Sequence, residues 1–148
     1  MCGPVLGLTT ALLLVAAAAS AHVTVWPAES QAGANERYVL RVPSEGALAT
    51  TSVELEVPFG VTILLMGAPA GWTYELRRDG DRVTAIVWTM NILPGEFAEF
   101  PFIARNPNAT EIVWRAYQHL EDGTVVEFTG RRGDPTPSPV TRLLPAAR

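Results

Sequence analysis

Prolines and glycines interrupt the chain about every ten residues, and this spacing strongly limits what it can fold into. The prolines concerned are Pro27, Pro43, Pro58, Pro69, Pro94 and Pro107. A proline inside a helix removes a hydrogen bond and clashes with the preceding turn, so long helices are excluded from most of this region. Short segments between turn residues are typical of β-sandwiches. The spacing therefore predicts an all-β fold, an immunoglobulin-like antiparallel β-sandwich.

Between these turns, apolar and polar residues alternate. Val53, Leu55 and Val57 fall on one face of an extended segment, with glutamates on the other face. A period of two is the signature of a half-buried strand. The same alternation runs through residues 36–43, where Tyr38, Leu40 and Val42 share one face, and through residues 109–122. We interpret both segments as strands, although the second also has helical potential.

Two Asp-Gly pairs, Asp79–Gly80 and Asp122–Gly123, lie between alternating segments. This dipeptide is a strong hairpin signal, so each pair predicts a tight turn between antiparallel strands. The tryptophans fall at positions that alternate into the expected core, and we interpret them as packing residues: Trp26, Trp72, Trp88 and Trp114.

Residues 1–21 have the features of a secretory signal. A short apolar run ends in Ala19-Ser20-Ala21, which matches the A-x-A cleavage pattern, and the run is too short to span a bilayer comfortably. Cleavage after Ala21 would make His22 the first residue of a secreted or periplasmic protein with no transmembrane anchor. The alternatives are an uncleaved membrane anchor or a wrong start codon.

The rest of the chain is long enough for one domain. We expect the sandwich to span residues 22–132, and residues 133–148 to form a proline-rich segment and a final short strand that packs on the same domain. The only cysteine, Cys2, lies in the signal, which excludes a disulfide or thiolate metal site in the finished protein. The net charge is −4 without a basic patch, which gives no support to nucleic-acid binding.

A histidine at a free N-terminus offers two nitrogen ligands, its α-amine and its imidazole Nδ1. The α-amine has a pKa of about 7.7–8.0, so a metal ion can displace its proton near neutral pH. Two nitrogens with additional oxygen donors suit tetragonal Cu(II). His22 is therefore a candidate copper ligand, the alternative being a solvated terminal histidine without a role.

Several segments follow one another in a distinctive order: "AHVTVWPAES", "RVPSEGALATTSVELEVPFGVT", "PAGWTYEL", "VTAIVW", "LPGEFAEFPFIARNP", "VWRAYQHLEDGTVVEFTG" and "PTPSPVTRL". From His22 to about Leu144 the chain resembles the bacterial YcnI-like domain family. The resemblance implies a secreted or envelope-attached β-sandwich that binds Cu(II) through a single-histidine brace formed by His22. It further implies a non-enzymatic role in copper homeostasis, as a chaperone or buffer. The partners would be the copper ion and a membrane copper transporter or another copper-binding protein.

The resemblance also implies a carboxylate near the metal. Glu99 in "GEFAEF" is the best match, and Glu96 and Glu127 are weaker candidates. Where the family commonly has a tryptophan near the copper, this chain has Phe128, which keeps an apolar wall but loses the indole N–H. Glu127 and Phe128 are adjacent in a strand, so they should point to opposite faces, which weakens the case for Glu127.

Two other functions stay open at this point. A copper monooxygenase would need His119, the second histidine, to face His22. We instead expect His119 to be a surface or packing histidine. A metal-free interaction module is the other alternative, because β-sandwiches host many functions.

Overall fold

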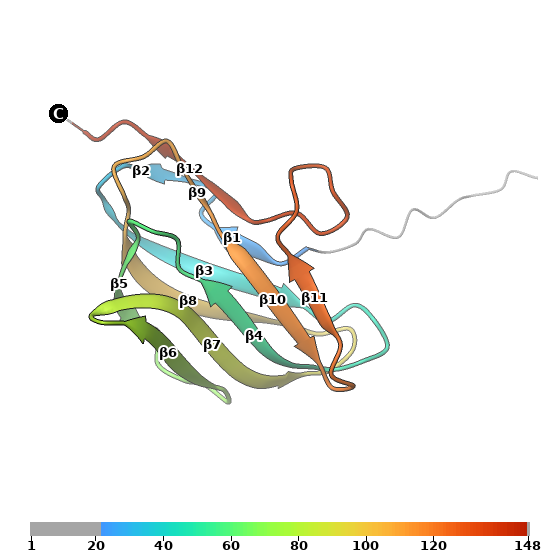
Figure 1. The fold of residues 1–148 in the computed structure, drawn as a ribbon. Coiled ribbons are helices and arrows are strands. Elements are labelled where there is room, and N and C mark those ends of the chain that lie inside the picture. Colours follow the sequence, from blue (N-terminus) through green and yellow to red (C-terminus); the bar gives the residue numbers. More distant parts are fainter. Residues whose placement is uncertain (1–21, 148) are drawn as a thin grey trace, which may run out of the picture.

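The computed structural model describes residues 22–147, and the predicted signal at residues 1–21 lies outside them. The described chain is built from strands in two facing sheets, as the immunoglobulin-like expectation required (Figure 1). One sheet has four strands in the order β1 (Thr24–Trp26), β3 (Asn35–Pro43), β8 (Phe97–Arg105) and β5 (Thr62–Met66). The other has five, in the order β11 (Val125–Phe128), β10 (Arg115–Leu120), β4 (Thr50–Glu56), β7 (Arg82–Ile92) and β6 (Thr73–Asp79).

A third, small sheet closes one end of the sandwich and joins both ends of the described chain. Its order is β2 (Glu29–Gln31), β12 (Val140–Leu144) and β9 (Glu111–Val113), with β12 parallel to β2 and antiparallel to β9. At its centre, the Trp114 Nε1–H donates to Thr141 Oγ1 at 3.1 Å, and Thr141 Oγ1 donates to the Pro27 carbonyl at 3.1 Å. These bonds fix the segment that follows β1 against the last strand.

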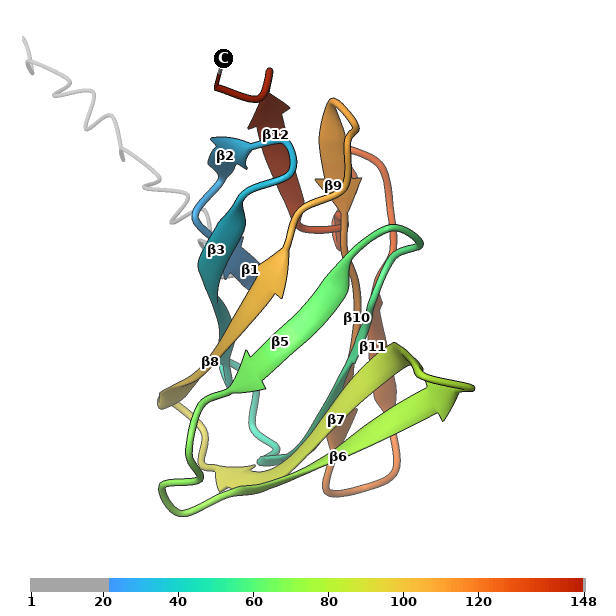
Figure 2. The same cartoon turned by 90° about the vertical axis from the view of Figure 1, so that its left-hand side faces the viewer.

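The core lies between the two large sheets (Figure 2). The residues predicted to face inward are buried, including Leu40 on β3 and Val53 and Leu55 on β4, each with no exposed area. Trp88 stacks on Phe100 with ring centroids 5.3 Å apart. Truncating one of the buried leucines to alanine would cost about 2–5 kcal/mol of unfolding free energy.

The tryptophan expectation is wrong for Trp26. Its side chain is 50% exposed, because Val25 takes the inward position of β1 and its neighbour must point outward. For the other three the expectation is confirmed. Trp88 and Trp114 are buried, and Trp72 is half-buried with its ring against Phe100, the centroids 5.4 Å apart.

The turn and strand predictions are also confirmed. Asp79–Gly80 joins β6 to β7, and Asp122–Gly123 lies between β10 and β11. Gly123 has a φ of +88°, a backbone conformation that is strained for any residue with a Cβ atom. Residues 109–122 contain β9 and β10, which belong to different sheets, and no helix. Among residues 22–147 there is no helix with the length and hydrophobicity needed to cross a bilayer.

Candidate metal centre

His22 lies two residues before β1, the edge strand of the four-stranded sheet. Val23 and Val25 are buried, while His22 is half-buried and Trp26 is exposed. Because side chains alternate along an extended chain, His22 belongs to the outward set with Thr24 and Trp26. The candidate ligand is therefore at a sheet edge and partly accessible to solvent.

Glu99 lies on the same outward face. Thr24 on β1 pairs with Arg41 on β3, and Arg41 pairs with Glu99 on β8. Directly paired residues share a face of the sheet, so the three side chains form one row. Two strand spacings separate β1 from β8, which places their backbones about 10 Å apart. Arg41 stands between the two candidate ligand strands.

The carboxylate of Glu99 is held by Arg41. Arg41 donates to Glu99 Oε1 from Nε at 2.9 Å and from Nη2 at 2.8 Å. Both side chains are almost half exposed, at 49% and 43%, so this ion pair contributes only about 0–1 kcal/mol. The guanidinium also lies 5.7 Å from the centre of the Phe97 ring. A metal ion that needed Glu99 would therefore displace Arg41 at small cost.

The two weaker carboxylate candidates lie elsewhere. Glu96 is exposed in the turn between β7 and β8, where its Oε2 accepts from the Leu93 backbone N–H at 2.9 Å. Glu127 is on β11, paired with Tyr117 on the outward face of the five-stranded sheet. The structure thus separates Glu127 from the face that carries Glu99.

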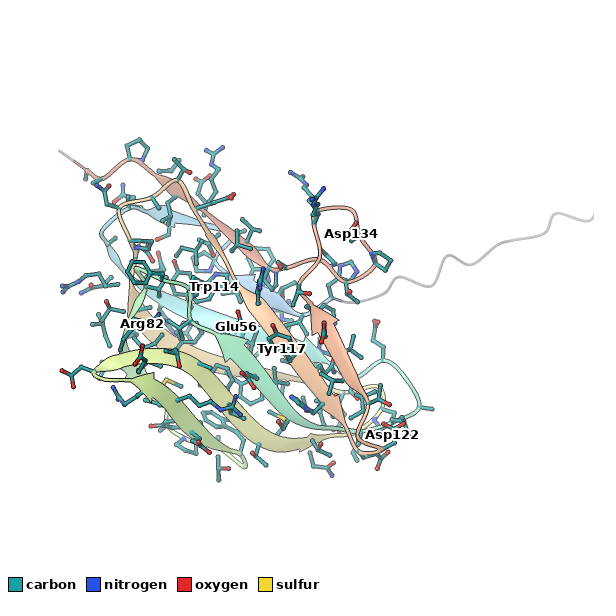
Figure 3. The ribbon with its side chains drawn as sticks, in the orientation of Figure 1. Glu56, Arg82, Trp114, Tyr117, Asp122 and Asp134 are labelled. Carbon is teal, nitrogen blue, oxygen red and sulfur yellow. The ribbon has the colours of Figure 1, made fainter. Side chains whose placement is uncertain are left out.

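Tyr117 has a carboxylate partner of its own. Its hydroxyl donates to Glu56 Oε1 at 2.7 Å, and the two side chains point toward each other from β10 and β4 (Figure 3). This hydrogen bond is the main reason that the pKa of Tyr117 is raised, because it stabilises the protonated phenol. Arg77 also forms an ion pair with Glu54 on this face at 2.8 Å, so the carboxylates of Glu54 and Glu56 both have partners.

Phe128 is buried and faces inward, whereas Glu127 is exposed, which confirms that they point to opposite faces. Phe128 lines an open cavity of about 260 Å³ whose wall also includes Pro43 and Gln118. Gln118 is fixed there, since its Nε2 donates to the Pro43 carbonyl at 2.8 Å and to Thr50 Oγ1 at 2.7 Å. If the register of β1 and β3 continued beyond Thr24, His22 would lie opposite Pro43, at this same end of the sandwich.

The two histidines lie in different parts of the sandwich. His119 is on β10, half-buried, between Ser52 of β4 and Val125 of β11. That row belongs to the outward face of the five-stranded sheet, whereas His22 precedes β1 of the four-stranded sheet. Within the described residues, no three histidine, aspartate, glutamate or cysteine side chains gather as a metal site.

Sequence reasoning missed Arg41. Its outward position could be inferred from the alternation in "ERYVLRVP", but its contact with Glu99 depends on strand pairing across 58 residues. No local pattern encodes that register.

Comparison with known proteins places the chain in a family. A family model described as a domain of unknown function (DUF1775) matches residues 22–143. The copper-binding protein CutI of Bacillus subtilis (strain 168) is 39% identical over 150 residues, which cover 99% of this chain and 72% of CutI. The chain belongs to the YcnI-like family.

The fold of this YcnI-like chain is also found in a solved structure. An uncharacterized protein from Nocardia farcinica with an immunoglobulin-like fold matches with a TM-score of 0.71 and 26% identity, covering 82% of this chain and 97% of the other. The family match begins at residue 22, so His22 is the first matched position.

Proposed function

We propose that this YcnI-like protein binds copper as Cu(II) outside the cytoplasm, through a single-histidine brace at His22. The observation that carries the proposal is the position of His22. It is the first residue of the family match, directly follows an A-x-A cleavage pattern, and leads into an exposed sheet edge. The similarity to CutI, a copper-binding protein, supports copper as the metal that is bound.

The ligands in this proposal are the α-amine and Nδ1 of His22, with an oxygen of Glu99. Cleavage after Ala21 frees the amine, and two nitrogens with oxygen donors suit tetragonal Cu(II). Glu99 would leave Arg41 to bind the ion and would offset part of its positive charge. Phe128 supplies an apolar wall to the neighbouring cavity without the hydrogen-bonding indole.

The role that follows is non-enzymatic. The protein would hold copper as a buffer or chaperone and pass it to a membrane copper transporter or to another copper-binding protein. The half-buried position of His22 supports this role, because a partly exposed edge site lets a second protein reach the ion.

The test is to acetylate the α-amine of His22 in the processed protein, which has no lysine amine to react. Acetylation removes the amine as a ligand and leaves the imidazole in place, so the chelate is lost. Because the second ligand of a chelate binds intramolecularly, we expect Cu(II) affinity to fall by about 10²–10⁴-fold, measured by competition with a chelator of known affinity. The EPR spectrum should also lose its amine-nitrogen contribution.

His119→Ala is the matched control, since it removes the other histidine and leaves the terminus intact. It should bind Cu(II) like the unmodified protein. Undiminished affinity in the acetylated protein would refute the brace.

A further inference from the structure

The outward face of the four-stranded sheet carries an apolar stripe. Trp26 pairs with Val39, and Val39 pairs with Pro101; in the next row, Ile103 pairs with Leu65. These five residues share the outward face, and we call them the apolar stripe. Trp26 is 50% exposed and Leu65 is 64% exposed, so the stripe presents large apolar side chains to solvent at both edges of the sheet.

The stripe has a hollow beside Gly67, which follows β5. Gly67 donates its N–H to the Pro101 carbonyl at 2.8 Å, and a Cβ added there would come within 2.5 Å of Pro101 Cγ. An open groove of about 260 Å³ lies beside Gly67, and its lining includes Arg37, Leu65 and Ile103. Apolar groups can therefore enter the face there as well as lie on it.

Positive charge surrounds the stripe. The outward positions of β3 and β8 carry Arg37, Arg41 and Arg105 against a single carboxylate, Glu99. Arg41 is paired with Glu99, and Arg105 Nε donates to the neutral Asn35 Oδ1 at 3.1 Å. The face therefore has an excess of two positive charges in a chain whose net charge is −4.

On the outward face of the five-stranded sheet, negative charges outnumber positive ones. The outward positions of the five-stranded sheet carry four glutamates and two arginines: Glu54, Glu56, Glu75, Glu127, Arg77 and Arg115. The excess of arginine is thus specific to the face that carries the apolar stripe.

We propose that the outward face of the four-stranded sheet binds an anionic phospholipid surface. Tryptophan is favoured at the membrane–water interface, since its indole is both apolar and hydrogen-bonding. Arginines near the surface are attracted to anionic headgroups. The arginines occupy three separate rows around the stripe, which suits a diffuse negative surface better than one acidic side chain of a protein. Membrane binding here would also hold the start of β1 near the lipid, and it does not depend on copper.

The test uses the metal-free chain from His22 and vesicles of phosphatidylglycerol with phosphatidylcholine. We expect the protein to sediment with these vesicles and not with phosphatidylcholine alone, and to dissociate as salt is raised. The tryptophan emission of the protein should shift to shorter wavelength on binding. The Trp26→Ala variant should not show that shift.

Charge reversal distinguishes this face from the rest of the molecule. Each arginine lost from the surface should weaken vesicle binding about fivefold, so the double variant Arg37→Glu with Arg105→Glu should weaken it by at least about 25-fold. The matched control, Arg77→Glu with Arg115→Glu, makes the same change in net charge on the opposite face and should weaken it far less.

Three results would overturn the proposal: no binding to anionic vesicles at low salt, equal losses in the two double variants, or binding to poly-glutamate in preference to vesicles. The last would assign the face to an acidic protein. Circular dichroism of each variant would verify that its strands are intact.

Discussion

The two outward faces of this sandwich differ in almost every chemical respect. The four-stranded face carries the apolar stripe, three arginines and, at its edge, the start of β1 with His22. The five-stranded face carries carboxylates, Tyr117 and His119. Each face is formed by the outward half of alternating strands whose other half fills a common core. The fold therefore constrains the inward residues strongly and leaves the two outward sets free to diverge.

One tyrosine of each sheet, Tyr38 and Tyr117, has a raised pKa for a different reason. Tyr38 is completely buried behind the four-stranded face, and burial raises its pKa to about 12. The pKa of Tyr117 is raised by its bond to Glu56. In the unfolded chain a tyrosine titrates near pH 10, so the folded state holds more protons above that pH.

The unfolding free energy should therefore be steady up to about pH 10 and fall by about 2 kcal/mol for Tyr38 as the pH rises to about 12. Chemical denaturation followed by tryptophan fluorescence at pH 9 and pH 12 measures this loss. Tyr38→Phe should remove most of it, at the cost of leaving the Asn106 Oδ1 acceptor without the 2.6 Å bond from Tyr38. An unchanged pH dependence in Tyr38→Phe would show that another group is responsible.

Removing the charge of one carboxylate on each face should change Cu(II) affinity to different extents. If the metal is bound on the four-stranded side, Glu99→Gln should weaken Cu(II) binding by about tenfold, because it removes an anionic ligand. Glu127→Gln, an equivalent change on the other face, should leave the affinity unchanged. A competition titration measures the Cu(II) affinity of both variants. Equal losses of affinity would mean that Glu99 is not a ligand.

Replacing Arg41 should have the smallest effect on Cu(II) affinity. Because this residue holds Glu99 through an exposed ion pair worth about 0–1 kcal/mol, Arg41→Gln should strengthen Cu(II) binding by up to about fivefold. The same titration measures the gain. Weaker binding in this variant would mean that Arg41 positions Glu99 for the metal and does not compete with it.

Much of the fold could be predicted from the sequence, since it depends on local signals. Alternation placed Leu40 and Val53 in the core, and the Asp-Gly pairs marked both hairpins. Alternation also determines the opposite directions of Glu127 and Phe128. Each of these features follows from the period of a single strand.

The remainder depends on which strands are neighbours. Trp26 was expected to alternate into the core, whereas Val25 takes the inward position of β1 and directs its neighbour outward. The Arg41–Glu99 pair and the apolar stripe arise from the register of strands far apart in the sequence. Alternation identifies the outward residues but not their cross-strand neighbours.

If cleavage after Ala21 creates the copper ligand, the intact mass of the mature chain will show both the cut and the bound metal. The protein should be expressed from Met1 in a bacterium and purified, and its intact mass determined with and without Cu(II). The purified chain should begin at His22 and gain one copper ion. A purified chain that begins at another residue and still gains one copper ion would refute the brace at His22.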